Sequence, residues 1–116
     1  MVSDPAYVPE RGHIVWLNFT PHAGHEQGGR RPALVLTPAS YNGLTGLMIA
    51  VPVTSRVKGY PFEVALPTGG AVQGVVLSDQ ARSLDWRARR AEYGVDVPEE
   101  VLDEVGGKLA ALLHLG

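Results

Sequence analysis

The densest group of chemically capable side chains lies in a short polar segment between residues 24 and 32. It carries an imidazole, a carboxylate, an amide and two guanidinium groups, from His25, Glu26, Gln27, Arg30 and Arg31. A planar guanidinium binds phosphate oxygens through paired hydrogen bonds, and a well-placed carboxylate can accept a proton. The segment therefore suits phosphate chemistry. On these residues alone, a surface loop with solvated charges remains the alternative interpretation.

Arg31 has a defined local position, because it directly precedes Pro32. A residue before proline is biased toward the extended conformation. The residues that follow, 33–36, form a short apolar run that ends before Pro38. The sequence therefore predicts that Arg31 lies at the mouth of a buried strand.

Apolar runs predict the strands that must position this segment. Their β-branched residues, alternation and flanking Gly and Pro turns are typical of strands. The expected strands cover residues 14–19, 33–36, 47–53, 62–66 and 74–77.

The end of the sequence predicts one helix. Pro98 is suited to a first helical turn, and apolar residues recur at threes and fours from Val101 to Leu113. Gly106 and Gly107 weaken that helix, so we expect close backbone approach to a neighbour there, with a helix break as the alternative. Short strands followed by a terminal helix predict a mainly β fold with α, either a strongly bent antiparallel sheet or a small barrel.

Composition limits the class of protein. A chain of 116 residues with 45% apolar and 19% charged residues predicts one globular domain, residues 1–116. No segment approaches the roughly 20 apolar residues of a membrane span, and residues 1–10 lack a secretion-signal pattern, so a cytoplasmic location is expected. The sequence has no cysteine, and its four histidines are irregularly spaced. We therefore expect neither a metal site nor a cofactor.

The formal charge of −2 hides an uneven distribution. Residues 30–90 carry eight basic side chains against three acidic ones, a net charge of +5, and both flanking segments are negative. The middle of the chain could therefore face phosphate. A scattered, solvated surface is the alternative interpretation.

Four ordered motifs resemble those of the MazF/PemK toxin family. The first is Glu26-Gln27-x-x-x-Arg31-Pro32-Ala33-Leu34-Val35-Leu36, and segments 51–55, 59–64 and 79–85 follow in the family's order and at similar spacing. Together these motifs span residues 7 to about 115. The chain is thereby identified as a member of this family.

The resemblance implies a small SH3-like β-barrel of the CcdB/PemK type that forms a homodimer. It also implies a metal-independent endoribonuclease toxin that cleaves single-stranded mRNA at short sequences and is neutralised by a cognate antitoxin. Metal-free RNA cleavage uses the 2′-hydroxyl of the substrate as nucleophile and leaves a 2′,3′-cyclic phosphate and a 5′-hydroxyl. The cleaved sequence cannot be transferred from the family, because the family varies in the corresponding loops.

Three residues fit the catalytic tasks. Arg31 would bind the scissile phosphate and neutralise the charge that builds in the transition state. Thr54 matches the catalytic Thr/Ser position of the family and could hydrogen-bond a phosphate oxygen. Glu26 is the first candidate for the general base, although it could instead orient Arg31, and His25 is a weaker candidate.

Other residues are expected to contact RNA or to brace the site. Asn18 could contact base edges, and Trp16, Tyr60 or Phe62 could stack on bases, although each aromatic residue could instead belong to the core. Asp79, Gln80 and Arg82 are expected to brace the site, and residues 86–90 form a basic patch with one aromatic residue. The expected substrate-binding residues are Gln27, His25, Ser55, Arg30, Arg56, Lys58, Arg82 and Arg87.

Two other functions remain open on the same fold. Gyrase-poisoning toxins have this barrel and dimer without nuclease chemistry, but they lack the Glu-Gln…Arg-Pro loop. An RNA-binding SH3-like module without activity is the third possibility.

Overall fold

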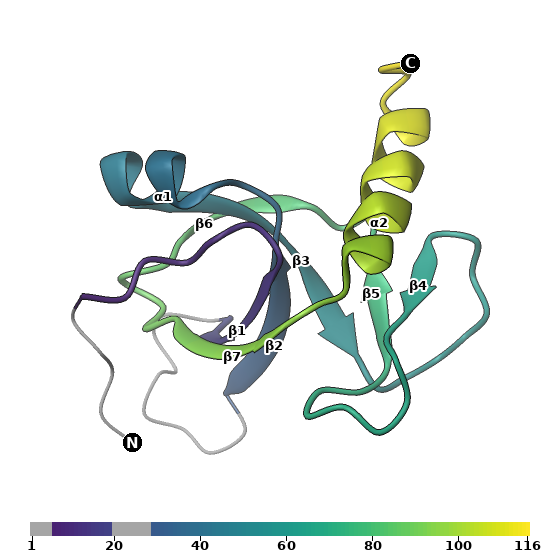
Figure 1. Ribbon diagram of the computed structural model, residues 1–116, viewed down its shortest axis with the longest axis horizontal. Helices are drawn as coiled ribbons and strands as arrows, with labels where there is room; N and C mark the ends of the chain where they lie inside the picture. Colours follow the sequence, from purple (N-terminus) through teal and green to yellow (C-terminus); the bar gives the residue numbers. More distant parts are fainter. Residues whose placement is uncertain (1–5, 20–28) are drawn as a thin grey trace.

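A bent antiparallel sheet of seven strands carries two helices (Figure 1). The computed structural model describes residues 6–19 and 29–116. In chain order, its elements are β1 (His13–Asn18), β2 (Arg30–Val35), α1 (Ala39–Thr45), β3 (Leu47–Thr54), β4 (Glu63–Ala65), β5 (Val75–Leu77), β6 (Arg82–Asp85), β7 (Glu92–Asp96) and α2 (Glu99–Leu112).

Strand β3 is the centre of the sheet. Along one edge it pairs with β2, and along the other it pairs first with β6 and then, at Val53 and Thr54, with β5. The strand order is β4-β5-β3-β2-β1-β7, with β6 beside β3. The predicted mainly β fold with a C-terminal helix is confirmed. Within the described residues, β4 and β7 do not pair with each other, so the sheet is strongly bent but not closed.

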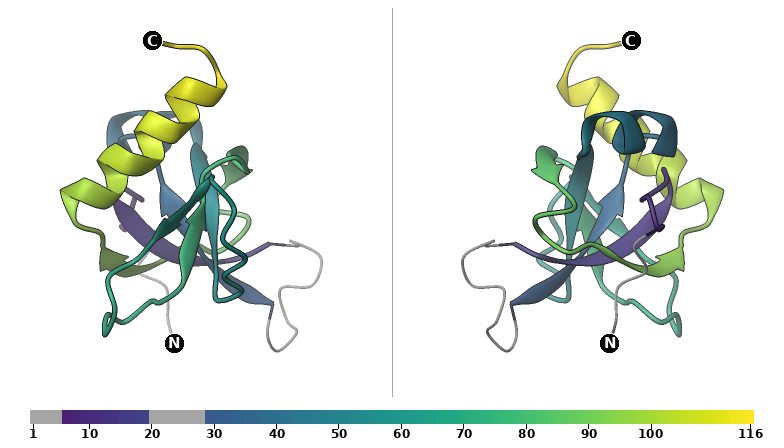
Figure 2. Two further views of the ribbon diagram at one scale, coloured as in Figure 1. Left: turned by 90° about the vertical axis from the view of Figure 1, so that its right-hand side faces the viewer. Right: turned by 90° about the vertical axis from the view of Figure 1, so that its left-hand side faces the viewer.

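Alternate residues of the central strands build two cores, as the two-residue period of a strand requires. One core contains Ile14, Leu34 and Val51, and α2 docks on it through Val101, Leu102 and Val105. Figure 2 shows α2 running obliquely across that side of the sheet. The second core lies on the opposite face and contains Val15, Leu17, Ala33, Val35, Met48, Ala50, Leu84, Trp86 and Ala91.

The expected close approach at Gly106 and Gly107 is wrong. The helix α2 continues through both residues, and a Cβ atom added at either one would meet nothing within 4 Å. The first turn of α2 contains Glu99 and Glu100, which are favourably placed at the positive end of the helix dipole. Only the first half of the predicted apolar stripe is buried, through Val101, Leu102 and Val105, whereas Leu112 and Leu113 are exposed (43% and 55%). Packing on the sheet therefore stabilises the part of α2 before Gly106.

The sequence did not predict α1. Its seven residues include Ser, Asn, Gly and Thr, which are weak helix formers. The fully buried Asn42 holds it in place, because its side-chain amide donates hydrogen bonds to the carbonyls of Pro9 (2.8 Å) and Thr37 (2.9 Å). Neither α1 nor α2, the helices within residues 6–19 and 29–116, is long and apolar enough to cross a membrane.

Candidate active site

A cleft of about 580 Å³ lies where the end of β3 meets the start of β2; we call it the main cleft. The strands are antiparallel, with Ala33 opposite Pro52, so the first residues of β2 lie beside the last residues of β3. Arg31 and Thr54, which are far apart in the sequence, both line this cleft. Its other lining residues are Trp16, Arg30, Pro32, Val53, Ser55, Arg56, Ala71, Val72 and Gln73.

The hydroxyl of Thr54 has a fixed orientation. Its Oγ1 accepts a hydrogen bond from the backbone N–H of Arg56 at 3.1 Å, which closes a tight turn at the end of β3. A hydroxyl that accepts in this way still has its own proton to donate. Thr54 can therefore offer a hydrogen bond to an anionic group in the main cleft.

The guanidinium of Arg31 is exposed at the mouth of β2, as the sequence predicts. Within the described residues it has no ion-pair or hydrogen-bond partner, so its donors remain open to a ligand. A guanidinium carries five N–H donors and a permanent charge. Arg31 is thus suited to bind phosphate oxygens.

Arg30 is the neighbour of Arg31 in β2, but its donors are already used. Its guanidinium donates to the carbonyls of Trp16 (3.1 Å) and Arg90 (2.7 Å) and to Asn18 Oδ1 (3.2 Å), and it pairs with Glu92 Oε1 at 2.5 Å. Asn18 is only 3% exposed, so its side chain serves this network rather than a base edge. Arg30 therefore braces the wall of the main cleft.

A second arginine holds the end of β1. Arg89 donates through Nη1 to the carbonyls of Asn18, at 3.1 Å, and Phe19. Desolvation is the main cause that lowers the pKa of Arg89, and the nearby Arg82 lowers it further. Arg30 and Arg89 thus anchor the described residues on both sides of segment 20–28. The predicted site residues His25, Glu26 and Gln27 lie outside the described residues.

A second cleft, of about 220 Å³, adjoins the main cleft and shares Thr54 and Arg56 with it. Its remaining lining residues are Lys58, Tyr60, Phe62, Glu63, Leu77, Asp79 and Gln80. The Glu63 carboxylate accepts the backbone N–H groups of Lys58 (3.0 Å) and Gly59 (2.9 Å), which fixes the loop between β3 and β4. Sequence reasoning missed this role of Glu63, because a carboxylate in an alternating strand gives no sign of the loop it holds.

The chain matches a known family over most of its length. The family is described as "PemK-like, MazF-like toxin of type II toxin-antitoxin system", and the match covers residues 10–113. The chain belongs to this toxin family.

Individual relatives agree with the family match. The endoribonuclease toxin MazF of Escherichia coli K12 is 46% identical over 107 residues, which cover 92% of this chain and 96% of that protein. The crystal structure of MazF (Form-I) from Deinococcus radiodurans is 70% identical, with a TM-score of 0.84 and coverage of 93% and 98% of the two chains. A MazE-MazF crystal structure (Form-II) from the same organism is 65% identical, with a TM-score of 0.84 and coverage of 92% and 96%.

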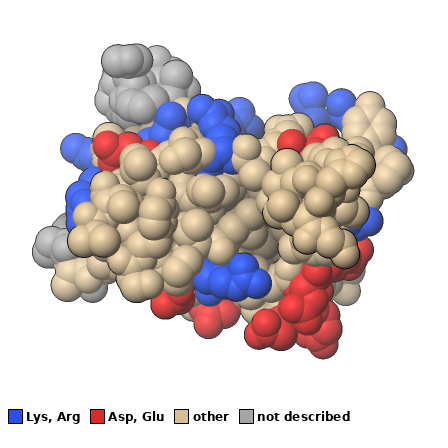
Figure 3. All heavy atoms as spheres, turned by 90° about the horizontal axis from the view of Figure 1, so that it is seen from above, with Lys and Arg blue, Asp and Glu red and all other residues tan. Residues whose placement is uncertain are grey.

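Two predicted RNA-binding residues of this toxin lie away from both clefts. Arg82 is paired with Ala50 in the β3–β6 ladder. Arg87 stacks over the Trp86 ring at 4.3 Å and reaches the carbonyl of Gly43 in α1, beyond the opposite end of β3 from Thr54. Figure 3 shows Lys and Arg side chains in several separate groups on one face of the molecule. The Lys and Arg side chains therefore do not form a single patch on that face.

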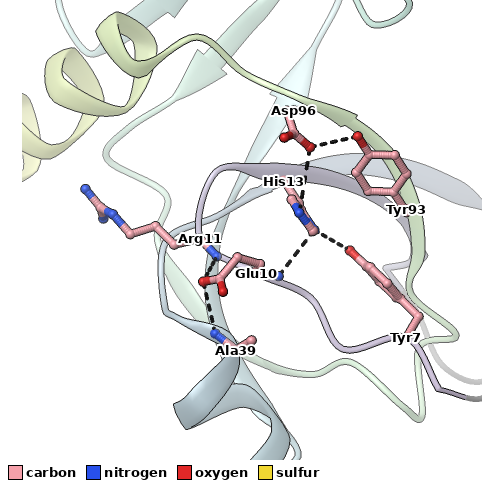
Figure 4. Close-up of polar contacts among 7 residues, drawn as sticks. All are labelled: Tyr7, Glu10, Arg11, His13, Ala39, Tyr93 and Asp96. Carbon is pink, nitrogen blue, oxygen red and sulfur yellow. Dashed lines mark hydrogen bonds and ion pairs between the residues drawn. The ribbon is translucent and has the colours of Figure 1, made fainter.

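A polar network that the sequence did not reveal joins the start of β1 to β7 (Figure 4). His13 Nδ1 accepts the backbone N–H of Glu10 (3.3 Å), so the Tyr7 hydroxyl donates to the same nitrogen at 2.8 Å. His13 Nε2 lies 3.7 Å from Asp96, to which the Tyr93 hydroxyl donates at 2.7 Å. None of these residues lines either cleft, so the network fastens the segment before β1 to the sheet.

The structure offers no obvious metal centre in the part of the chain that it describes. No group of three or more His, Asp or Glu side chains within residues 6–19 and 29–116 could hold a metal ion. The chemistry that the main cleft supports with the described residues is charge neutralisation by Arg31 and hydrogen bonding by Thr54.

Proposed function

We propose that this toxin is a metal-independent endoribonuclease that cleaves single-stranded mRNA and is neutralised by a cognate antitoxin. Relatives that are 44–46% identical over most of the chain are endoribonucleases by name. The observation that carries the proposal is the meeting of Arg31 and Thr54 in the main cleft. This pair can hold one phosphate group from two sides.

The proposed reaction is an intramolecular transesterification at the scissile phosphate of the RNA. The 2′-oxygen bonds to the adjacent phosphorus, the bond from phosphorus to the 5′-oxygen breaks, and the products are a 2′,3′-cyclic phosphate and a 5′-hydroxyl. Arg31 neutralises the non-bridging oxygens as negative charge builds on them. The Thr54 hydroxyl donates a hydrogen bond to one of these oxygens.

Two protons must move in this reaction. Glu26 accepts the proton of the 2′-hydroxyl in our proposal, with His25 as the weaker candidate. The departing 5′-oxygen takes up the second proton from a water molecule. We propose that the RNA on either side of the scissile phosphate is bound by Gln27, Ser55, Arg56 and Lys58. The last three of these residues line the two clefts.

We also infer a homodimer. Four large apolar side chains are exposed on α1 and the adjoining half of β3: Tyr41 (38%), Leu44 (87%), Leu47 (38%) and Ile49 (37%). This apolar surface, bordered by Asp85 opposite Leu47 and by Arg87 beside Gly43, suits an isologous contact, in which a patch meets its own copy. A Leu44→Lys variant that remains a dimer in sedimentation experiments would place the interface elsewhere.

The antitoxin is proposed to reach the main cleft. A solved MazE-MazF complex from Deinococcus radiodurans (Form-II) contains a relative that is 65% identical to this chain. An acidic or acidic-aromatic antitoxin segment would compete with RNA for Arg31. Binding of the antitoxin without any effect on RNA cleavage would contradict this proposal.

We further propose one domain over residues 1–116, acting in the cytoplasm.

Incubation of the purified protein with labelled single-stranded RNA in excess EDTA tests the function. The expected result is cleavage that EDTA does not affect, with 5′-hydroxyl and cyclic phosphate ends. RNA that is bound but intact would indicate a binding module, and inhibition of gyrase without RNA cleavage would indicate a gyrase poison. Loss of cleavage in EDTA, restored by added metal, would overturn metal independence.

A further inference from the structure

Gly74, the residue before β5, lies with its backbone directly against the end of β3. A Cβ atom added to it would lie 2.9 Å from the carbonyl carbon of Thr54 and 3.1 Å from Cα of Ser55, and closer still to the carbonyl oxygen of Thr54. These are backbone atoms, which cannot rotate away as a flexible side chain can. Gly74 also has a φ of +118°, which side-chain-bearing residues rarely adopt. Only glycine fits this position.

The backbone of Gly74 has little freedom to move away from β3. Its carbonyl accepts a hydrogen bond from the backbone N–H of Leu66 at 3.0 Å, and the next residue, Val75, is buried and pairs with Thr54. Figure 1 shows β5 beside the end of β3. A larger residue at position 74 would therefore move Thr54 and Ser55 as well as β5.

The same contact shapes the main cleft. The three residues that precede Gly74, which are Ala71, Val72 and Gln73, line the cleft together with Thr54. The hydroxyl of Thr54 is oriented by the N–H of Arg56, so a shift at Thr54 and Ser55 disturbs that hydrogen bond. Gly74 thus sets the distance between two walls of the cleft.

We infer that Gly74 is a positioning residue for RNA cleavage, which places the Thr54 hydroxyl by letting β5 close onto the end of β3. This inference rests on the proposed function, because it takes Thr54 as part of the cleavage site. Two other glycines provide a contrast. Gly59 and Gly69 also have positive φ, +80° and +83°, but a Cβ atom at either would meet nothing within 4 Å.

The test compares Gly74→Ala with Gly69→Ala, which also places Ala at a positive φ but without the clash. Steady-state cleavage of single-stranded RNA is measured for both variants, in the wild-type and Thr54→Ala backgrounds. We expect Gly74→Ala to lower kcat on the order of 100-fold with little change in KM, since small displacements at a reacting centre have effects of that size. Gly69→Ala should keep the wild-type kcat.

The double variant separates positioning from general damage. If Gly74 acts through Thr54, Gly74→Ala causes no further loss of kcat once Thr54 is Ala. Equal losses in both backgrounds, or equal losses from Gly69→Ala and Gly74→Ala, would overturn the inference while leaving the proposed function intact. A wild-type protein that does not cleave RNA would instead sink the proposed function.

A readout independent of activity keeps the inference testable in that case. Amide hydrogen exchange should show loss of protection at Arg56 in Gly74→Ala and not in Gly69→Ala; unchanged protection at Arg56 would overturn the inference. If Gly74→Ala is partly unfolded, both variants are measured in trimethylamine N-oxide, which favours compact states. A Gly74→Ala chain that stays unfolded there would also overturn the inference, because Gly74 would then serve the whole fold.

Discussion

Arg30 in β2 reaches past β1 to form an ion pair with Glu92 in β7, with 2.5 Å between Nη2 and Oε1. Both strands pair with β1, on opposite edges. The guanidinium also meets the carbonyls of Trp16 and Arg90, so one side chain ties three strands together beside the main cleft. The stability of this part of the sheet therefore depends on Arg30, whereas the chemistry is assigned to Arg31.

The Arg30–Glu92 pair gives the first prediction. Glu92→Gln removes the charge but keeps the shape, and we expect it to lower the free energy of unfolding by about 1.5–3 kcal/mol, the usual range for hydrogen bonds to charged groups. Chemical denaturation measures the change. Glu99→Gln, in the exposed first turn of α2, is the matched control and should change the stability far less. Equal effects of the two substitutions would contradict the bracing role of Arg30.

Substitutions of Arg31 and Arg30 should have separate effects, on the rate of RNA cleavage and on the free energy of unfolding. Arg31→Ala is expected to lower kcat on the order of 100- to 1000-fold, the effect of removing one transition-state donor, with little change in unfolding free energy. Arg30→Ala should behave in the opposite way, with a loss of stability and RNA cleavage that persists wherever the variant is folded. Thermal unfolding and RNA cleavage rates of both variants distinguish the catalytic role from the structural one. Full cleavage by Arg31→Ala would remove Arg31 from the proposed site.

The sequence predicts the strands that contain unbroken apolar runs. The segments 33–36 and 47–53 correspond to β2 and β3, whose core residues form such runs. It missed β7, whose sequence Glu-Tyr-Gly-Val-Asp is polar and only partly buried, because pairing along β1 defines this edge strand. It missed α1 because buried hydrogen bonds of Asn42, rather than propensity, stabilise that helix.

The site was only partly accessible from the sequence. The resemblance brought Arg31 and Thr54 together before the cleft was known and assigned substrate binding to Arg30, but it did not reveal that Arg30 is held in a hydrogen-bond network. Neighbouring residues of a strand point in opposite directions, and only the fold shows which guanidinium meets carbonyl oxygens. The clash that excludes a side chain at Gly74 was also hidden, since it arises between segments twenty residues apart in the sequence.

Thr54 provides a test of whether its hydroxyl or its shape matters. Thr54→Ser keeps the oxygen that accepts from the Arg56 N–H, whereas Thr54→Val keeps the size and loses the hydrogen bond. We expect Thr54→Ser to retain most of the cleavage activity and Thr54→Val to lose on the order of 100-fold in kcat. Comparable kcat values for the Val variant and the wild type would show that the hydroxyl does not act in the reaction.

The network around Tyr7 predicts a dependence of stability on alkaline pH. Desolvation is the main cause that raises the pKa of Tyr7 above its ordinary value of 10.0, and the charges of Tyr93, Asp96 and Glu10 add to it. Below pH 10 the phenol is protonated in both the folded and the unfolded chain, so its contribution does not change with pH. As the pH rises above 10, the unfolded chain loses this proton first, and the free energy of unfolding must fall.

Tyr7→Phe isolates this effect, because it removes the titrating hydroxyl and keeps the ring that stacks on His13. The variant should be less stable than the wild type at neutral pH, since it loses the 2.8 Å hydrogen bond to His13 Nδ1. Above pH 10, its free energy of unfolding should fall less steeply than that of the wild type. Urea unfolding at a series of pH values between neutral and strongly alkaline measures both differences. Parallel curves over the whole range would mean that the hydroxyl of Tyr7 titrates alike in the folded and unfolded chains.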